Sequence, residues 1–155
     1  HFEVAKLLNN LGSTLLALGE APEARDCLER SLSMMERERG RQHLEVASVL
    51  TNLAEALGAL GGHGRARELL EEALSVKEQA LGSEHPRTAA TAAALGVALT
   101  AGGGAGAEDM GRAETLLRQA MRVQERCLGP DNLEVARTLA NFANVLGFQG
   151  RLAEK

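Results

Sequence analysis

Histidines recur at one position of an internal repeat, and imidazole is a common ligand of zinc. His1, His43 and His85 follow one another at intervals of 42 residues. A zinc ion needs its nitrogen ligands at about 2.1 Å, whereas packed helices of successive units lie roughly 10 Å apart. We therefore predict no metal site. We expect these side chains to lie in the turns between repeats and to hydrogen-bond the start of the next helix, and His63 to be solvated in a turn.

A glycine-rich run, Gly102-Gly103-Gly104-Ala105-Gly106, invites comparison with a phosphate-binding loop. The run lacks the Gly-Lys-Ser/Thr of a nucleotide-binding loop, and no strand is predicted before it. We interpret it as a flexible turn between helices. No serine, cysteine or carboxylate has a base or partner at a spacing typical of catalysis. The sequence therefore indicates neither an enzyme nor a cofactor.

Asparagines also recur at one repeat position. Asn10, Asn52 and Asn141 share it, and Ala94 takes it in the third unit. An asparagine amide offers two donors and an acceptor, so it can bind the main chain of an extended peptide without demanding a particular sequence. The alternative is structural, with each asparagine binding a neighbouring turn of the array. The sequence alone leaves both interpretations open.

The elements that carry these residues repeat every 42 residues, with an insertion of five residues in the third unit. An internal repeat of this length predicts a solenoid, in which each unit buries its apolar face against its neighbours. The predicted units are residues 1–42, 43–84, 85–131 and, in part, 132–155, all within a single repeat domain, 1–155. The leucines that define the repeat are Leu8, Leu11 and Leu15, which return as Leu50, Leu53 and Leu57.

Each unit is predicted to form two helices, A and B, because its apolar residues follow the i, i+3, i+4, i+7 pattern of an amphipathic helix. Glycines end these segments, and Pro22 suits the first turn of a helix. The turns are short, so neighbouring helices should be antiparallel. The seven main helices are expected at about 4–18, 22–39, 46–60, 66–81, 87–101, 109–128 and 135–148, with a break at Gly150 before a further helix B.

The composition fits an all-α protein. Trp, Tyr and Ile are absent, and the packing residues are mainly Leu and Ala, which favour helices. The net charge is −4, which argues against a nucleic-acid-binding protein with a basic face. Cys27 and Cys127 are expected to be free thiols that are buried or half-buried, which favours an intracellular, cytoplasmic location. No apolar run reaches the ~18 residues of a membrane-spanning helix.

The small residues of the repeat carry a resemblance to a known family. They occupy one position of helix A and one position of helix B, as in the tetratricopeptide repeat. Leu8-Asn9-Asn10-Leu11-Gly12 and Leu81-Gly82-Ser83-Glu84-His85-Pro86 are similar to the characteristic segments of the 42-residue kinesin light chain variety. HEAT and armadillo repeats have similar periods but fit the two-helix unit less well. The matching small residues are Gly12, Ala54, Gly96 and Ala143 in helix A, and Ala24, Ala66 and Ala113 in helix B.

The resemblance implies a right-handed α-solenoid of about three and a half repeats, with helix A lining a concave groove. It further implies a scaffold that binds a peptide or a partner protein in this groove, without a cofactor, a nucleic acid or a membrane. The asparagines Asn10, Asn52 and Asn141 are the expected contacts. By helical spacing, Lys6, Asn9, Ser48, Thr51, Glu55, Arg137 and Asn144 lie near the same face.

The ends of the chain suggest a second hypothesis. The first residue, His1, lies at a repeat boundary, and Lys155 lies about one turn into a predicted helix, so we expect a piece of a longer array. A solenoid without capping units exposes an apolar terminal face. The alternative function is therefore a structural spacer or a self-association module that has no groove ligand.

Overall fold

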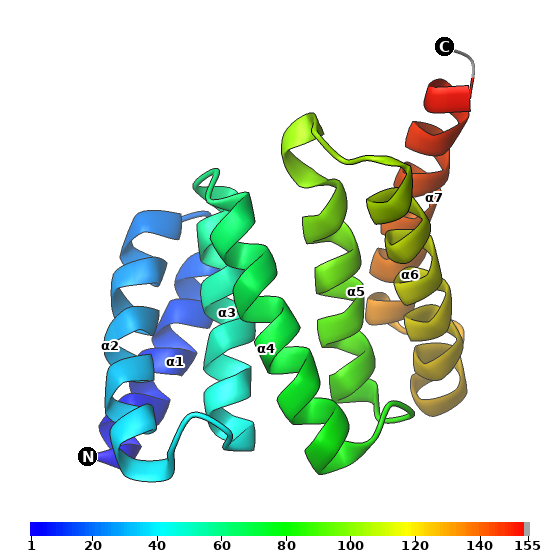
Figure 1. The fold of residues 1–155 in the computed structure, drawn as a ribbon. Helices are drawn as coiled ribbons and strands as arrows, with labels where there is room; N and C mark the ends of the chain where they lie inside the picture. Colours follow the sequence, from blue (N-terminus) through cyan, green and yellow to red (C-terminus); the bar gives the residue numbers. More distant parts are fainter. Residues whose placement is uncertain (154–155) are drawn as a thin grey trace. The chain divides into compact units, whose positions relative to one another are not determined.

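The structure is a computed structural model that describes residues 1–153, with side chains described through residue 150. Figure 1 shows that the described chain is built from α-helices joined by short turns. The all-α fold class and the seven main helices predicted from the repeat are therefore confirmed for the described residues. The helices are α1 (Phe2–Ala17), α2 (Ala21–Arg39), α3 (Leu44–Ala59), α4 (His63–Leu81), α5 (Pro86–Thr100), α6 (Ala107–Leu128) and α7 (Leu133–Ala153), with a short 3₁₀ segment, η1 (Ala101–Gly103).

Glycines end the helices where the sequence places them. Gly40 follows α2 with φ of +83°, and its N–H donates to the carbonyl oxygen of Glu36. Gly129 follows α6 with φ of +86°, and its N–H donates to Glu125 in the same way. A side chain is strained at such a φ, whereas glycine adopts it freely. These two glycines therefore stop helix B where the chain must turn toward the next helix A.

Two predicted boundaries are wrong. Helix α4 begins at His63, earlier than the predicted start at about residue 66. The sequence pattern predicts a break at Gly150, but α7 continues through this residue to Ala153. A single glycine costs a helix about 1 kcal/mol relative to alanine, which is too little to end it without a competing turn. The residues after Gly150 are Arg, Leu and Ala, which all favour helix, so the helix continues.

The chain divides into two compact units, His1–Ala80 and Leu81–Lys155, which we describe separately. In the first unit, α2 packs on α1 and on α3, and α1 also contacts α3. The closest approach lies between Gly12 of α1 and the fully buried Leu28 of α2. Near this contact, the buried hydroxyl of Ser31 donates to the carbonyl oxygen of Ala5 at 2.7 Å. Small residues therefore let the two helices of this hairpin approach closely.

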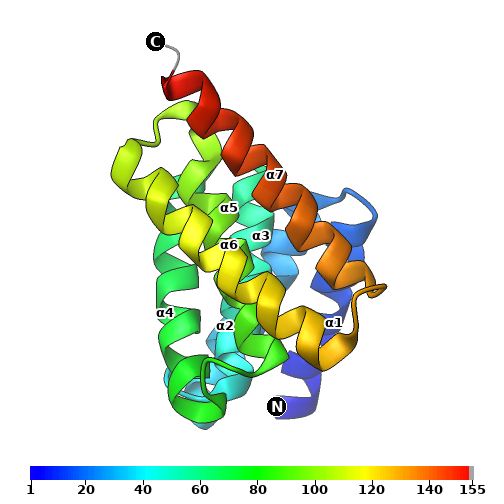
Figure 2. The same cartoon turned by 90° about the vertical axis from the view of Figure 1, so that its right-hand side faces the viewer.

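The second unit uses the same packing. Helix α6 packs on both α5 and α7, and Figure 2 shows α6 and α7 lying side by side. Gly96 of α5 faces Leu117 of α6, and a Cβ built on Gly96 would lie 2.9 Å from the Leu117 Cγ. Leu117 is fully buried, as are Leu95 and Val123. The small-residue position predicted from the sequence is thus a point of close helix contact in both units.

Ion pairs connect the turn between α2 and α3 to helices α2 and α4. Arg41 donates to both carboxylate oxygens of Glu72 in α4, at 2.5 and 2.8 Å, and it also pairs with Glu36 of α2. The hydrogen bond from Arg41 lowers the pKa of the Glu72 carboxyl, although partial burial opposes this shift. The same hydrogen bond raises the pKa of Arg41. A two-pronged arginine–carboxylate contact is stronger than an ordinary surface ion pair.

The corresponding turn of the second unit carries the opposite charge. Glu84, in the turn before α5, pairs with Arg122 and Arg126 of α6 at 2.8 Å each. The hydrogen bond from Arg122 is the main cause that lowers the pKa of Glu84, and Arg126 adds to it. In both units, therefore, the turn before a helix A is tied to the helix B that follows.

The glycine contact predicts a strong effect on stability. In a Gly12→Val variant, the new Cβ would lie 2.5 Å from the Cγ of Leu28, and Leu28 is fully buried and has little room to move. We expect a loss of about 2–3 kcal/mol in the free energy of unfolding, measured by urea denaturation. Gly58→Ala in α3 is the matched control, because nothing lies within 4 Å of the added Cβ. It should gain about 0.5–1 kcal/mol, and equal effects of the two changes would contradict this packing.

The Arg41–Glu72 pair predicts a pH-dependent contribution. Because the folded-state pKa of Glu72 lies below its ordinary value of 4.5, its stabilisation is present above that value and is lost as the pH falls through the folded-state pKa. The pair is partly exposed, so we expect Glu72→Gln to cost about 0.5–1 kcal/mol at pH 7. The difference from the unmodified protein should shrink below pH 4.5 in urea titrations. Glu78→Gln, an exposed change on the same helix, is the matched control.

Candidate functional site

The recurring histidines begin helices, as predicted. The Nδ1 atom of His43 accepts a hydrogen bond from the Glu45 N–H at 3.2 Å, and that of His85 accepts from Arg87 at 3.0 Å. Asn132 takes the same role in the fourth repeat, where its Oδ1 accepts from the Glu134 N–H at 2.9 Å. The cap predicted for His1 is wrong, since its side chain makes no such bond.

The fourth histidine and one of the two cysteines differ from prediction in their exposure to solvent. His63 is the first residue of α4 and is half-buried, so its prediction as a solvated turn residue is wrong. Cys27 is a half-buried free thiol as predicted, but Cys127 is an exposed one, because it lies in the last turn of α6, where the helix leaves the core. Among the described residues, no three His, Cys, Asp or Glu side chains gather to hold a metal ion.

In the first unit, two of the predicted groove residues bind each other. The Asn52 amide of α3 donates to the Asn9 Oδ1 of α1 at 3.0 Å, and both residues are half-buried. The bond joins the helix A of one repeat to the helix A of the next. It therefore gives Asn52 a structural role, and it is the kind of contact within the array that the sequence left open.

Two further predicted residues are held by internal hydrogen bonds. The Ser48 hydroxyl donates to the carbonyl oxygen of Leu44, and the Thr51 hydroxyl donates to that of Ala47. Thr51 also accepts a hydrogen bond from the Nζ of Lys77, a lysine of α4 that is only 5% exposed. Thr51 therefore supplies a partner for a buried charge, whose burial without one would be costly.

The exposed members of the predicted set in the first unit are Lys6, Asn10 and Glu55. The Nζ of Lys6 lies 3.8 Å from Glu3 and 5.6 Å from the centre of the Phe2 ring. The backbone carbonyl of Asn10 accepts from the Thr14 hydroxyl, while its exposed amide makes no hydrogen bond to another described residue. Asn10 thus offers an amide to solvent or to a ligand.

The second unit brings two predicted asparagines to a pocket. Asn141 and Asn144 of α7 line a cavity of about 490 Å³, and neither amide makes a hydrogen bond within the described residues. The third predicted residue of α7, Arg137, is exposed, 3.8 Å from Glu134, and does not line the cavity. The remaining lining residues are Val97, Thr100, Ala101, Gly102, Gly103, Ala105, Met110, Val145 and Phe148.

A single alanine accounts for the free amide of Asn141. By the repeat pattern, Ala93 stands in α5 where Asn9 stands in α1 and Thr51 in α3. Its methyl group offers no polar atom to Asn141. The same exchange affects α6, where the buried Gln124 stands at the position of Lys77 and its Oε1 has no hydrogen-bond partner among the described residues. Two polar side chains whose counterparts are paired in the first unit, Asn141 and Gln124, therefore have an unpaired amide group in the described part of the second.

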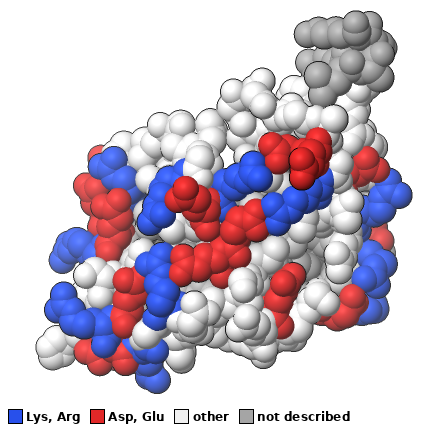
Figure 3. Space-filling view, in the orientation of Figure 1, with Lys and Arg blue, Asp and Glu red and all other residues white. Residues whose placement is uncertain are grey.

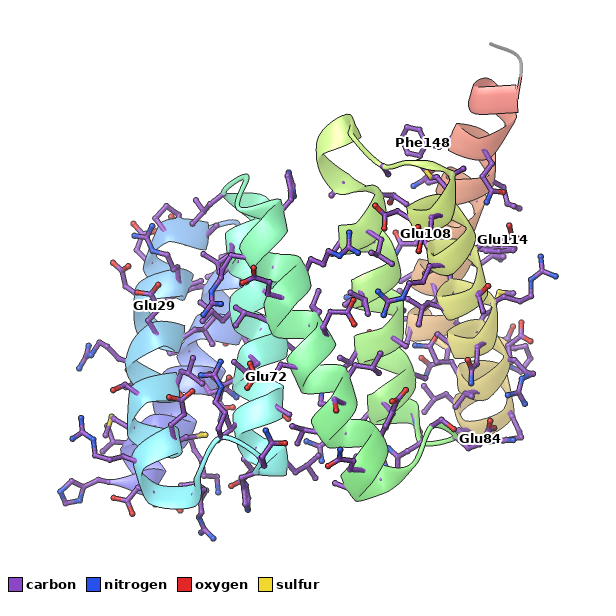
Figure 4. All side chains as sticks on the ribbon, in the orientation of Figure 1. Glu29, Glu72, Glu84, Glu108, Glu114 and Phe148 are labelled. Carbon is purple, nitrogen blue, oxygen red and sulfur yellow. The ribbon has the colours of Figure 1, made fainter. Side chains whose placement is uncertain are left out.

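The apolar wall of the pocket was missed at the sequence level. Val97 and Phe148 are about 40% exposed, and neither was predicted to belong to a site. The signal that could have found them is the glycine-rich insertion, since extra residues at a helix–helix turn must alter the space between the helix ends. Figure 4 shows Phe148 on α7 beside this turn.

Charges are interspersed on the surface. On the face shown in Figure 3, Lys and Arg side chains stand next to Asp and Glu side chains, and no wholly basic area is visible on it. Oppositely charged side chains also pair along single helices, as Arg118 does with Glu114 at 2.5 Å in α6. Among the described residues, no helix is both long enough and apolar enough to span a membrane.

Comparison with known proteins identifies the family. Residues 3–79 and 104–154, more than half of the chain, match the model of the tetratricopeptide repeat. The chain therefore belongs to the tetratricopeptide repeat family, and the predicted solenoid fold class is confirmed. Repeats of this family generally mediate protein–protein interactions and are typically not enzymes. The unmatched residues 80–103 include α5, in which Ala92 stands where α1 and α3 have leucines.

Solved structures of kinesin light chain type share the fold. The nearly identical TPR-like repeats of a kinesin light chain candidate from Podosopora anserina match with a TM-score of 0.82 and 24% identity, over 99% of this chain and 71% of that one. BtubC (BKLC) from P. vanneervenii matches with a TM-score of 0.78 and 20% identity, over 94% of this chain and 56% of that one. No curated protein matches the chain in sequence.

Proposed function

We propose that this protein is an interaction scaffold that binds an extended peptide of a partner protein on the exposed faces of its A helices. The observation that carries this proposal is the set of unpaired amides on these faces. The side-chain amides of Asn10 in α1 and of Asn141 and Asn144 in α7 make no hydrogen bonds within the described residues. Amides can donate to and accept from a peptide main chain, and multiple contacts of this kind give affinity without a deep site.

The hydrogen bonds of the first unit divide the predicted set into two groups. Asn9, Asn52, Ser48 and Thr51 are engaged within the protein, so they support the shape of the surface. The residues available to a ligand are the exposed Lys6, Asn10 and Glu55 in the first unit, and the exposed Arg137 and Asn144 with the half-buried Asn141 in the second.

Peptide binding is tested by removing the available amides. A peptide selected from a phage-displayed random library against the whole chain serves as the probe. We expect the double variant Asn10→Ala, Asn141→Ala to bind it about 10-fold more weakly, since each lost hydrogen bond contributes about 0.5–1.5 kcal/mol. The thermal midpoint should not change, because neither side-chain amide is hydrogen-bonded to another described residue.

Asn52→Ala is the contrasting variant. It removes the partner of the half-buried Asn9, so it should lower the free energy of unfolding by about 1 kcal/mol. Binding of the same peptide to the folded protein should change little. If the double variant keeps full affinity in isothermal titration calorimetry, the exposed amides are not the binding groups.

A second candidate function, self-association, is favoured by apolar surface at α1 and α7. Leu7 and Leu11 of α1 are 67% and 48% exposed, and Leu133 and Leu139 of α7 are 79% and 52% exposed. Leucines in such numbers on terminal helices of a solenoid favour further packing. Under this alternative, sedimentation equilibrium should show a mass that rises with concentration, and Leu7→Ser with Leu139→Ser should restore the monomer. A constant monomer mass would exclude self-association.

A further inference from the structure

The pocket of the second unit is a consequence of the insertion in the third repeat. Helix α6 has 22 residues, whereas α2 and α4 have 19 each. When the buried Ala113 is aligned with its counterpart Ala24, Met110 falls opposite Ala21, the first residue of α2. The insertion therefore extends α6 by one turn at its beginning and adds residues to the preceding loop.

The loop that results borders the pocket with little side-chain bulk. Gly102 and Gly103 have φ of +81° and +73°, and both line the cavity together with Ala105. A Cβ added to Gly103 would meet nothing within 4 Å. The main chain of the loop is therefore accessible to a bound group, and the opposite wall belongs to α7.

The lining has the character of a site for a neutral, partly apolar group. Val97, Met110, Val145 and Phe148 form its apolar part, and none of the described residues that line it is charged. Asn141 is half-buried and Asn144 is exposed, so one amide lies deeper than the other. The volume of about 490 Å³ is within the range of ligand pockets, and it exceeds the space that a single Phe or Leu side chain requires.

We propose that this pocket receives one large apolar side chain of a bound peptide, while Asn141 and Asn144 hydrogen-bond the peptide main chain on either side of that residue. This inference rests on the proposed function and specifies its partner: an extended, neutral segment with a Phe, Leu or Met anchor. The amides of Asn141 and Asn144 can bind the main-chain peptide groups on either side of the anchor residue, and the apolar part of the pocket can receive its side chain. A charged anchor would lose its hydration without gaining an ion pair from the described lining residues.

N-acetyl-phenylalanine N-methylamide is the probe, because it carries one apolar side chain between two peptide groups. Titrated into the isotope-labelled whole chain and followed by NMR, it should shift the backbone signals of Gly103 and Ala105 and the side-chain amide signals of Asn141 and Asn144. The shifts should saturate with a dissociation constant on the order of 1 mM, as expected for a ligand of this size. N-acetyl-alanine N-methylamide should bind at least 10-fold more weakly. Equal shifts with the two compounds would overturn the proposal.

Ala105→Trp places an indole in the pocket and should abolish these saturable shifts. Its matched control is Ala107→Trp, an exposed position at the start of α6 that does not line the cavity and should bind the probe normally. A second variant deletes residues 104–108, which restores the third repeat to 42 residues. In this variant Gly103 is the turn glycine between the two helices, as Gly19 is in the first repeat. Both pocket variants should lose at least 10-fold in affinity. Unchanged binding by either folded variant contradicts the assignment.

The phage-selected peptide separates this inference from the proposed function. If the peptide needs Asn10 but binds the deletion variant as well as the unmodified chain, the pocket assignment fails and the scaffold function stands. If the phenylalanine compound saturates the pocket but no library peptide is selected, the scaffold function fails. A selected peptide that contains a large apolar residue supports both if two changes weaken its binding equally: replacement of that residue by alanine, and deletion of residues 104–108 from the protein. The two changes together should then weaken binding no more than either change alone.

Discussion

The close approach of the two helices within each hairpin is the contact on which the rest of the structure depends. Gly12 faces Leu28 and Gly96 faces Leu117, in each case where an added Cβ would overlap a buried leucine. Because helix A has no side chain at this point, a leucine of helix B fills the space. The position of α2 on α1, and of α6 on α5, follows from this contact, and these helices in turn position the exposed face of each helix A.

Much of this arrangement can be predicted from the sequence, because residues of the same type recur at equivalent positions of several repeats. The helices, the glycine ends and the caps formed by His43 and His85 all follow from patterns whose physical cause is local. The break expected at Gly150 does not follow, since one glycine decides little without a neighbouring helix to pack against. Local signals therefore place the elements well and place the last boundary poorly.

The candidate site was harder to predict than the fold, because its properties depend on pairs of residues from different helices. The recurring asparagines were recognisable, but their roles differ with the residue opposite. Asn52 meets Asn9 and is bonded, whereas Asn141 stands opposite the position of Ala93 and remains unpaired. The cavity beside Asn141 also needs the extra turn of α6, which no single repeat position reveals.

The turns that precede α3 and α5 carry opposite charges, so the second and third repeats are not interchangeable at these turns. Arg41 finds Glu72 on the helix B that follows it, while Glu84 finds Arg122 and Arg126 on its own. By the repeat pattern, Arg41 would meet Gln119 if the third unit replaced the second, and Glu84 would meet Ser75 and Gln79 in the reverse exchange. Similar repeats are prone to assemble out of order during folding. In either exchange these ion pairs would not form, and this loss disfavours the wrong order. The charges of the two turns therefore favour the observed order of the second and third repeats.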